Sequence, residues 1–496
     1  MTATFAARCG IHDTARENAV RQVTEVISSS DIELVRFVWC DLHGVTRGKT
    51  LVASAAADAM RQGVGMVSTL MLKDTSDRTA FKVFEPGGVA GVSGLAGFEH
   101  ASNLLLLADP LSFRQLPWAP KTGWLQCQPW FQDGRPVELD SRRVLQAALG
   151  QLHDAGLAMK CGLEVEFHIY RIDDTQQQLD PELASWPAHP PRVSMIHPGY
   201  NLLTESWFDM ADEPLRIVQH TAQALGLPLL SLEIELGPSQ VEAVFEASDA
   251  MTAADSMVLF RNAVKQALRR AGYHATFMCR PPFPQIMSSG WHLHQSLLDA
   301  STGKNAFQRD APADNSTPAD ASHTLSAVGE NYLAGLLEHA RGMAAFCTPT
   351  VNGFGRFRPN ALAPQSVLWG RDNRGAMLRV IGSCGDGATR IENRIGEPAA
   401  NPYLYFASQI HAGLDGIHRK LAAPPATDSP YAADEARLPT SLDEALAAMR
   451  ADTAMTQGFG SAFIGYFDRI KQAELARFNE AQDKDDFHRR EYFSRI

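Results

Sequence analysis

Cysteine is scarce in this chain, and its spacing argues against two common uses of the residue. The 496 residues include 7 Cys, and no two of them form a Cys-x-x-Cys pair. They stand at positions 9, 40, 127, 161, 279, 347 and 384. An odd number of scattered cysteines indicates reduced thiols, not a disulfide framework or a zinc site. We therefore expect a cytoplasmic protein.

Long apolar runs and an excess of basic residues are also missing. No segment approaches the roughly 18 consecutive apolar residues that a membrane helix needs, and the first 20 residues lack the apolar core of a signal peptide. Lys and Arg total 45 against 56 Asp and Glu, which gives a net charge of −11. Because binding to a phosphate backbone requires a basic face, neither nucleic acid nor a membrane is an expected partner.

Two glycine-rich nucleotide motifs are absent as well. The segment GVTRGKT, residues 44–50, is similar to a P-loop, but three residues separate its glycines where the motif needs four. No GxGxxG follows a predicted strand. The sequence therefore predicts neither a P-loop nor a Rossmann dinucleotide site.

The pattern along the chain predicts an α+β fold of more than one domain, as the length suggests. Residues 1–30 form a helical segment with a helix over 14–29, and residues 31–115 are a small domain of short strands and Gly-rich turns. In residues 116–496, helices that end near Gly alternate with strands. The charged helical tail over 468–496 is expected to be solvated or to contact another subunit.

One predicted strand carries an unusual pair of acids. In CGLEVEFHIY, residues 161–170, apolar side chains alternate with Glu164, Glu166, His168 and Tyr170, which is the period of a strand. The two carboxylates could lie on a solvated face of an antiparallel sheet. Alternatively, they point inward and hold a divalent cation, because neighbouring like charges repel without one.

Three further segments supply matching polar residues. Glu235 and Glu242 flank a predicted turn at Gly237-Pro238. His292 and His294 share one strand face, with Ser296 next on it, and each could be an ordinary polar residue of a sheet face. Segment ATRIENR places Arg390, Glu392 and Arg394 at alternate positions, which could also be a cross-strand salt-bridge ladder. Segment 355–380 adds more arginines, which include Arg356, Arg374 and Arg379.

Together these segments predict a hard, oxygen-rich site. Five Glu and a His without a Cys companion favour Mg²⁺ or Mn²⁺ over zinc. Several arginines on neighbouring segments suit the recognition of phosphate and carboxylate groups. Carboxylate-held cations with converging arginines are what ATP-dependent phosphoryl transfer requires.

Five ordered motifs resemble the glutamine synthetase family, from about residue 31 to residue 450. They are CGLEVEF, ELGPSQVE, FMCRPPFPQIMSSGWHLHQSLLD, NGFGRFRPNALAPQSVLWGRDNRGAMLRV and ATRIENRIGEPAANPYLYFASQIHAGLDGI. The resemblance implies a β-grasp domain over 31–115 and a catalytic domain over 116–496, with a curved antiparallel sheet flanked by helices. It also implies a homo-oligomer, typically a dodecamer of two hexameric rings, with active sites between subunits.

The resemblance also implies a role for each site residue, with ATP and two to three Mg²⁺ or Mn²⁺ ions per site. The implied ligands of the metal that anchors glutamate are Glu166, Glu235 and Glu242. The implied ligands of the metal that accompanies ATP are Glu164, His292 and Glu392. Implied contacts with glutamate come from Arg356 and Arg394, with the phosphates from Arg374, Arg379 and Arg390, and with the nucleotide from His294 and Ser296. Asp41 is implied to meet the amine from a neighbouring subunit.

One departure from the family pattern concerns the amine. Ammonia-using members carry a glutamate six residues after the glutamate-binding arginine, and here that position is Leu362. A carboxylate can hold ammonium and remove its proton, which a leucine cannot. A leucine instead offers apolar area, worth about 25 cal/mol per Å² covered.

We therefore expect an ATP-dependent ligase that joins the γ-carboxylate of L-glutamate to an organic amine through a γ-glutamyl phosphate. A small hydrophobic or aromatic amine is favoured, with a polyamine next. Two alternatives remain at this point: a true glutamine synthetase that uses ammonia, and an inactive member with a structural or regulatory role.

Overall fold

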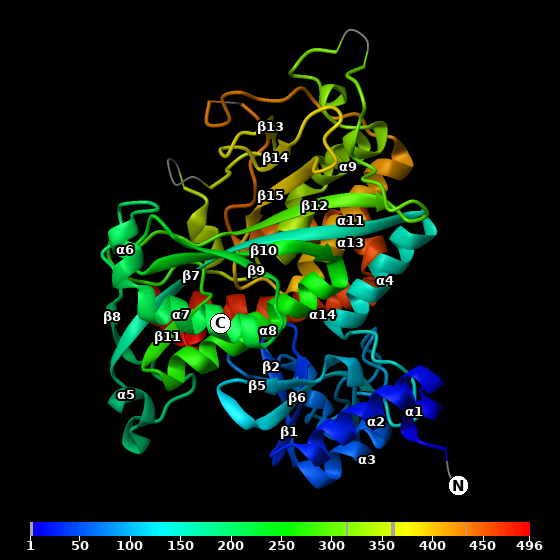
Figure 1. Ribbon diagram of the computed structural model, residues 1–496, viewed down its shortest axis with the longest axis vertical. Coiled ribbons are helices and arrows are strands. Elements are labelled where there is room, and N and C mark those ends of the chain that lie inside the picture. The colour runs from blue at the N-terminus through cyan, green and yellow to red at the C-terminus, as the bar shows by residue number, and fades with distance from the viewer. Residues whose placement is uncertain (1–2, 314–315, 359–362, 433) are drawn as a thin grey trace.

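The N-terminal part of the chain forms a six-stranded sheet in the computed structural model, which describes residues 3–313, 316–358, 363–432 and 434–496. The strands are β1 Leu34–Cys40, β2 Thr46–Val52, β3 Val64–Val67, β4 Asn103–Ala108, β5 Arg114–Leu116 and β6 Ala119–Trp130. Their order is β2-β1-β6-β4-β3, with β5 paired to β6. The predicted domain boundary at residue 115 therefore falls inside this sheet, which lies below the larger domain in Figure 1.

Within the described residues of the larger domain, nine strands form a second sheet. They are β7 Leu157–Asp174, β8 Arg192–Met195, β9 Leu229–Ile234, β10 Gln240–Asp249, β11 Tyr273–Thr276, β12 Trp291–Asp299, β13 Trp369–Arg371, β14 Leu378–Ile381 and β15 Arg390–Gly396. The main order is β13-β14-β15-β12-β7-β10-β9, and β8 and β11 also pair with β7. All of these pairs are antiparallel except β13 with β14.

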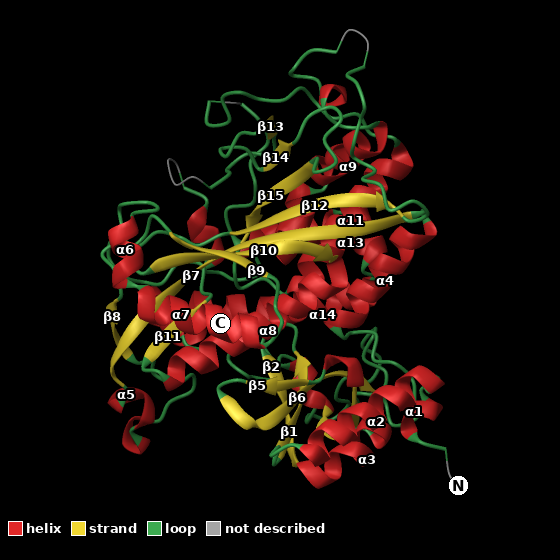
Figure 2. Ribbon diagram, in the orientation of Figure 1, coloured by secondary structure: helices red, strands yellow, loops and turns green. Residues whose placement is uncertain are grey.

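Helices accompany both sheets, so the predicted α+β class is confirmed (Figure 2). In the first domain they are α1 Phe5–Arg8, α2 Thr14–Ser29 and α3 Ala56–Gln62. In the larger domain they are α4 Ser141–Asp154, α5 Gln176–Leu179, α6 Glu205–Met210, α7 Asp212–Ala224, α8 Ala250–Arg270, α9 Ala327–Glu338, α10 Ala340–Cys347, α11 Pro402–Arg419, α12 Leu442–Ala451, α13 Thr453–Gly458, α14 Ser461–Glu480 and α15 Lys484–His488. Among the residues described, no helix combines the length and the apolar character that crossing a bilayer requires.

The side chains of strand β7 alternate between an apolar face of the sheet and a charged face. Its Leu163, Val165 and Phe167 are fully buried, and the Phe167 ring packs edge-on against Phe260 of α8 with centroids 6.0 Å apart. Because successive strand side chains point to opposite faces, Glu164 and the neighbouring acid two residues on must face away from α8. The helices therefore cover one face of the sheet and leave the other for the charged groups.

The predicted hairpin between β9 and β10 is present. The two strands pair antiparallel, and Glu235 N donates to Gln240 O at 3.0 Å to close the turn. Glu242 lies directly opposite Glu166 of β7 in the register. The turn thus brings Glu235 and Glu242 close to β7, the strand that carries Glu164 and Glu166.

The C-terminal tail differs from the prediction of a solvated or subunit-contacting face. Lys471 and Glu474 of α14 are buried as an ion pair 2.9 Å long, and Phe493 packs on His274 with ring centroids 4.6 Å apart. The prediction did not include these buried parts of the tail, because charged residues can be buried when they pair with one another; contact with another subunit stays a prediction. All seven cysteines, as predicted, are free thiols.

A buried histidine joins three helices and predicts a pH-dependent stability. His339 lies 2.8 Å from Asp415 Oδ2 through Nε2 and 3.0 Å from Asp452 Oδ2 through Nδ1. Burial acts to lower the pKa of His339, but the hydrogen bonds with both carboxylates outweigh it and raise the pKa above 6.5. The stabilisation is therefore complete below pH 6.5 and is lost as the pH rises through the folded-state pKa.

We expect the His339→Gln variant to lose about 2–3 kcal/mol of stability at pH 6, the scale of hydrogen bonds to a charged group, and less at pH 9. Denaturant midpoints at both pH values measure this difference. The control is His418→Gln, at an exposed position near the end of α11. Equal losses at the two pH values would show that His339 contributes no charge to the fold.

Candidate active site

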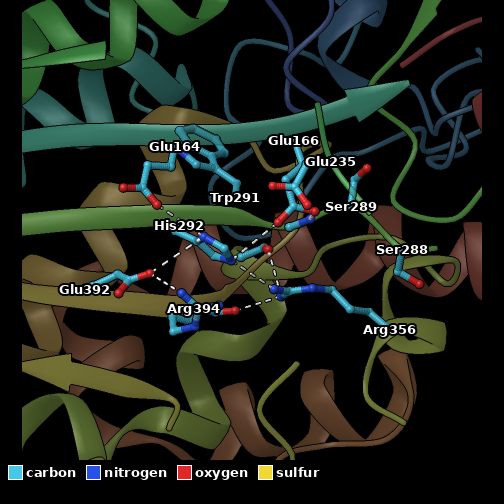
Figure 3. A network of polar contacts seen from close by, with 12 residues as sticks. Glu164, Glu166, Glu235, Ser288, Ser289, Trp291, His292, Arg356, Glu392 and Arg394 are labelled. Atoms are coloured by element: carbon cyan, nitrogen blue, oxygen red, sulfur yellow. Dashed lines mark hydrogen bonds and ion pairs between the residues drawn. The ribbon is translucent and has the colours of Figure 1, made fainter. Parts of the chain in front are cut away.

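Most of the predicted site residues meet on the charged face of the second sheet, and Figure 3 shows seven of them. Strand register brings them together in neighbouring pairs: Glu242 opposite Glu166, His292 opposite Glu164, and His294 opposite Glu392. Arg379 of β14 continues the row, because it lies opposite Glu392. These pairs come from β10, β7, β12, β15 and β14, whose residues span nearly half of the sequence.

His292 stands at the centre of this cluster. Its Nδ1 lies 3.5 Å from Glu164 Oε2 and 3.7 Å from Glu392 Oε1, and its Nε2 lies 3.7 Å from Glu166 Oε1. The ring is therefore within reach of three carboxylates from two strands, as Figure 3 shows. The salt-bridge ladder considered for Glu392 is also real, since this residue accepts from Arg379 Nη1 at 3.0 Å.

Two groups of side chains have the spacing of cation ligands. In each group the ligand atoms all lie within 4.8 Å of one another: Glu164, His294 and Glu392 in one, and Glu164, Glu242 and His292 in the other. Glu164 belongs to both groups. The structure thus places His294, predicted as a nucleotide contact, as close to the acids as His292.

Burial, helped by neighbouring carboxylates, shifts the pKa values of two acids upward. Burial, followed by the nearby carboxylate of Glu166, raises the pKa of Glu242 to about 10 and that of Glu235 to about 8. Glu164 is the opposite case: burial acts to raise its pKa, but hydrogen bonds with the two histidines lower it. Without a counterion, the Glu242 side of the cluster therefore holds protonated carboxyls at neutral pH.

Four predicted arginines border the cluster. Arg394 donates to Glu392 from the next position on the same strand face, and Arg379 Nη1 donates to the other Glu392 oxygen. Arg356 is buried, with Nη1 donating to Arg394 O at 2.7 Å and Nη2 lying 3.4 Å from His292 Nε2. Arg390 Nε lies 3.1 Å from His294 Nδ1. The cations therefore surround the Glu392 side, away from Glu242.

Four other predicted residues are not drawn into this network. Ser296 lies further along β12, opposite Lys160, and Arg374 is exposed in the turn between β13 and β14; within the described residues, neither has a hydrogen bond or ion pair to the cluster. Leu362 lies outside the described residues.

Asp41, the fourth of these residues, is 3 % exposed, and its own chain binds both of its carboxylate oxygens. Oδ1 accepts from His43 N at 2.9 Å and from Val45 N at 3.0 Å, and Oδ2 accepts from Arg47 Nε at 2.7 Å. Asp41 therefore fixes the β1–β2 turn. Its predicted contact with an amine stays a prediction and would require these bonds to break.

The sequence analysis did not identify the residues that position Glu166. Its Oε2 accepts from Gln240 Nε2 and from Gly290 N, both at 2.9 Å, and Gln240 Nε2 also lies 3.1 Å from Ser289 Oγ. Gln240 could have been found, because it lies two residues before Glu242 and so on the same strand face. The backbone contact from Gly290 has no signal in the sequence.

The donor set fits divalent cations of the hard class. Neighbouring groups outside the ligand set hold these side chains in place: Gln240 and Gly290 bond to Glu166, and Arg390 bonds to His294. Ligands of a metal are usually oriented by such second hydrogen bonds. Glu164, Glu166 and Glu242 are packed together with little contact to solvent, so ionising all three is costly unless a cation compensates them. No cysteine contributes, so the set suits Mg²⁺ or Mn²⁺ better than a thiophilic ion.

Comparisons with known proteins agree with this arrangement. Residues 138–490 match the model of the glutamine synthetase catalytic domain. The chain is 37% identical over 483 residues to a γ-glutamylanilide synthase of an Acinetobacter species, covering 96% of this chain and 94% of the relative. It is 30% identical to a glutamine synthetase of Methanococcus maripaludis, over 94% of this chain and 97% of that one.

A solved structure gives the same result for the fold. The structure of a GmaS–ADP complex superimposes with a TM-score of 0.73 at 27% identity, and covers 93% of this chain and 97% of that one. The matches extend well beyond the charged face of the sheet, into the N-terminal sheet and its helices. The chain therefore belongs to the glutamine synthetase family and is an ATP-dependent carbon–nitrogen ligase.

Proposed function

We propose that the protein joins the γ-carboxylate of L-glutamate to an organic amine through a γ-glutamyl phosphate. The observation that carries this proposal is the row of acids and histidines across β10, β7, β12 and β15, bordered by four arginines. A γ-carboxylate oxygen attacks the terminal phosphorus of ATP and ADP departs. The amine nitrogen then attacks the acyl carbon and loses a proton to solvent, the bond from that carbon to the phosphate oxygen breaks, and phosphate departs.

We assign the acids and histidines of the cluster to two cations according to their positions. We assign Glu166, Glu235 and Glu242 to one cation and Glu164, His292 and Glu392 to another, with His294 close enough to the latter to serve it as well. When bound, the Mg²⁺ or Mn²⁺ ions supply positive charge to the transferred phosphoryl group. Gln240 and Gly290 hold Glu166 in place through their hydrogen bonds.

The arginines are assigned to the anionic parts of the substrates. Arg356 and Arg394, on the inner side of the cluster, bind glutamate. Arg379 and Arg390 bind phosphate groups, and Arg374 and Ser296 complete the nucleotide site when ATP is present. Planar guanidinium groups suit both tasks because they donate two parallel bonds to a carboxylate or phosphate.

An organic amine is favoured over ammonia by two observations. Leu362 stands where ammonia-using relatives carry a glutamate, and it can neither pair with ammonium nor remove its proton. The 37% identity to a γ-glutamylanilide synthase supports a small hydrophobic or aromatic amine, which is already neutral near pH 7 in the aromatic case. A polyamine is ranked below these amines, because its distal ammonium groups would need further acidic residues to pair with.

The proposal predicts the order of activity in an amine panel. With glutamate, ATP and Mg²⁺, we expect faster phosphate release with aniline or a short alkylamine than with ammonium at equal low-millimolar concentration. A polyamine is expected to fall between them. Mass spectrometry of the product identifies the γ-glutamyl amide. Ammonium as the preferred substrate would make the protein a glutamine synthetase, and release with none of the amines would favour an inactive member.

A substitution at the same position gives the converse test. The Leu362→Glu variant restores a carboxylate and is expected to raise kcat/KM for ammonium about tenfold or more, as expected for general base catalysis. The matched control, Leu362→Gln, is polar but cannot accept a proton in this way. Equal gains in both variants would show that polarity, not base catalysis, limits ammonium use.

We further propose that the enzyme is cytoplasmic and assembles as a dodecamer of two hexameric rings. The free cysteines support a reducing compartment, and membership of the family supports the ring. Light scattering of the purified protein measures the assembly directly.

A further inference from the structure

A pocket that the ligase chemistry does not use lies between the two domains. Its volume is about 190 Å³, and three separate parts of the chain line it. They are the β1–β2 turn with Thr46, helix α8, and the C-terminal residues. In Figure 1, α8 runs between the second sheet and the N-terminal strands β1 and β2. Both domains therefore meet at this pocket.

Cations dominate the titratable groups of the pocket wall. Arg261 and Lys265 of α8 face it together with Arg495, while the buried His43 has its pKa lowered to about 3 by burial and is neutral. Two carboxylates lie nearby: Asp41 of the adjoining turn is already bound by Arg47, and the carboxylate of Ile496, the last residue, accepts from Phe277 N and Thr276 Oγ1. Three cations therefore stand against one carboxylate in the pocket wall, in a protein whose net charge is negative.

Two of these three cations lack an acidic partner within the part of the chain that the structure describes, and the third has a distant one. Neither Arg261 nor Lys265 has a carboxylate oxygen within 4.0 Å, and Arg495 Nη2 reaches only Asp77, at 3.9 Å. Arg261 is 6 % exposed, and its Nε is buried without a hydrogen-bond partner. Its Nη1 donates to Pro398 O and Ala400 O at 2.7 and 2.9 Å, which holds the guanidinium in place.

Lys265 is the least satisfied of these groups. Its Nζ donates to Ser494 O at 3.2 Å, the single hydrogen bond found for it among the described residues. Burial, and then Arg261 and Arg495, lower the pKa of Lys265 to about 7. Lys265 is partly buried, and a cation held away from water without a counter-charge is costly. An anion in the pocket would compensate all three cations at once.

We propose that this pocket binds a compact oxyanion, a phosphate or carboxylate group, between the β1–β2 turn, α8 and the C-terminal residues. The volume is below the roughly 300 Å³ of pockets for drug-sized ligands, so it suits a free ion or the charged end of a small metabolite. Thr46, Asn262 and Gln266 add polar groups to the wall. Because the anion contacts both domains, its binding stabilises their contact, and none of the cations that hold it belongs to the acid and arginine cluster of the second sheet.

The test uses sulfate on the full-length protein, with ionic strength held constant by KCl. We expect sulfate at about tenfold above its Kd to raise the melting temperature by roughly 1–3 °C. This rise should fall to less than half in Lys265→Gln and in Arg495→Gln. Each variant is compared with itself with and without the anion, so a change in basal stability does not obscure the result.

Two controls locate the site. Lys304→Gln removes an exposed lysine elsewhere and should keep the full rise. Arg379→Gln alters the phosphate side of the ligase site and should also keep it. A rise lost only in Arg379→Gln would place the anion at the ligase site and overturn the proposal. No rise in the unsubstituted protein, or equal rises in all variants, would overturn it as well.

Further arms with inorganic phosphate, acetate and glutarate identify the source of the oxyanion. A larger rise with phosphate and sulfate than with the carboxylates indicates a phosphate group, and the reverse order indicates a carboxylate. Either order supports the proposal only if Lys265→Gln suppresses the larger of the two effects. Rises of equal size that Lys265→Gln leaves unchanged would contradict it.

Discussion

Replacing Glu242 by Gln is expected to lower ligase activity about 10²–10³-fold while leaving the metal-free protein at least as stable as before. Glu242 is 7 % exposed, faces Glu166 across the strand pair, and has its pKa raised to about 10 by burial and by its acidic neighbours. Without a cation the residue is protonated at neutral pH, and a glutamine of nearly the same shape reproduces that neutral form. A bound cation instead requires the carboxylate.

Glu242→Gln is therefore expected to lose activity and its response to metal while the metal-free protein keeps its stability. ADP release measures activity, and melting in EDTA, Mg²⁺ or Mn²⁺ measures the response to metal. The unsubstituted protein should melt higher with either cation than in EDTA, and Glu242→Gln should lose most of this difference. The control is Glu246→Gln, an exposed acid on the same strand. A Glu242→Gln protein that keeps both its activity and its metal response would exclude Glu242 as a ligand.

The second large effect is expected in the C-terminal tail. Arg477 of α14 donates from Nε to Asp74 Oδ2 at 2.8 Å and from Nη1 to Glu491 Oε2 at 2.9 Å. The Glu491 side chain is fully buried and also accepts bonds from Thr75 and Ser76 of the N-terminal domain. Arg477→Met keeps the aliphatic stem but leaves two buried carboxylates without a cation, at a cost of about 3–5 kcal/mol.

Denaturant midpoints at pH 7 measure this loss, and two further variants define its origin. Arg490→Gln removes an arginine of the same tail that pairs with the more exposed Asp486, and should cost less than about 1 kcal/mol. Adding Glu491→Leu to Arg477→Met should recover part of the stability, because replacing a buried pair by apolar groups is nearly neutral. A loss in Arg477→Met no larger than in Arg490→Gln would mean that the buried pair contributes little.

The sequence by itself determined the local structure and the kinds of residue at the site. The alternation in residues 161–170 predicted β7, and the Gly237-Pro238 turn predicted the hairpin that carries Glu242. Both features depend on neighbours a few residues apart, which periodicity and turn chemistry describe well. The types of ligand, carboxylates and histidines without cysteine, were also sufficient to predict a hard cation.

Only the tertiary structure decided which of these residues share a ligand group and which charges are buried. His292 meets Glu164 through the register of strands more than 100 residues apart, and that register also brings His294 as close to Glu164 as His292. The burial of Glu491 depends on Arg477 and on a distant loop of the N-terminal domain. A sequence pattern records the charge of each residue but not its partner, and in a buried site the partner determines whether the charge is tolerated.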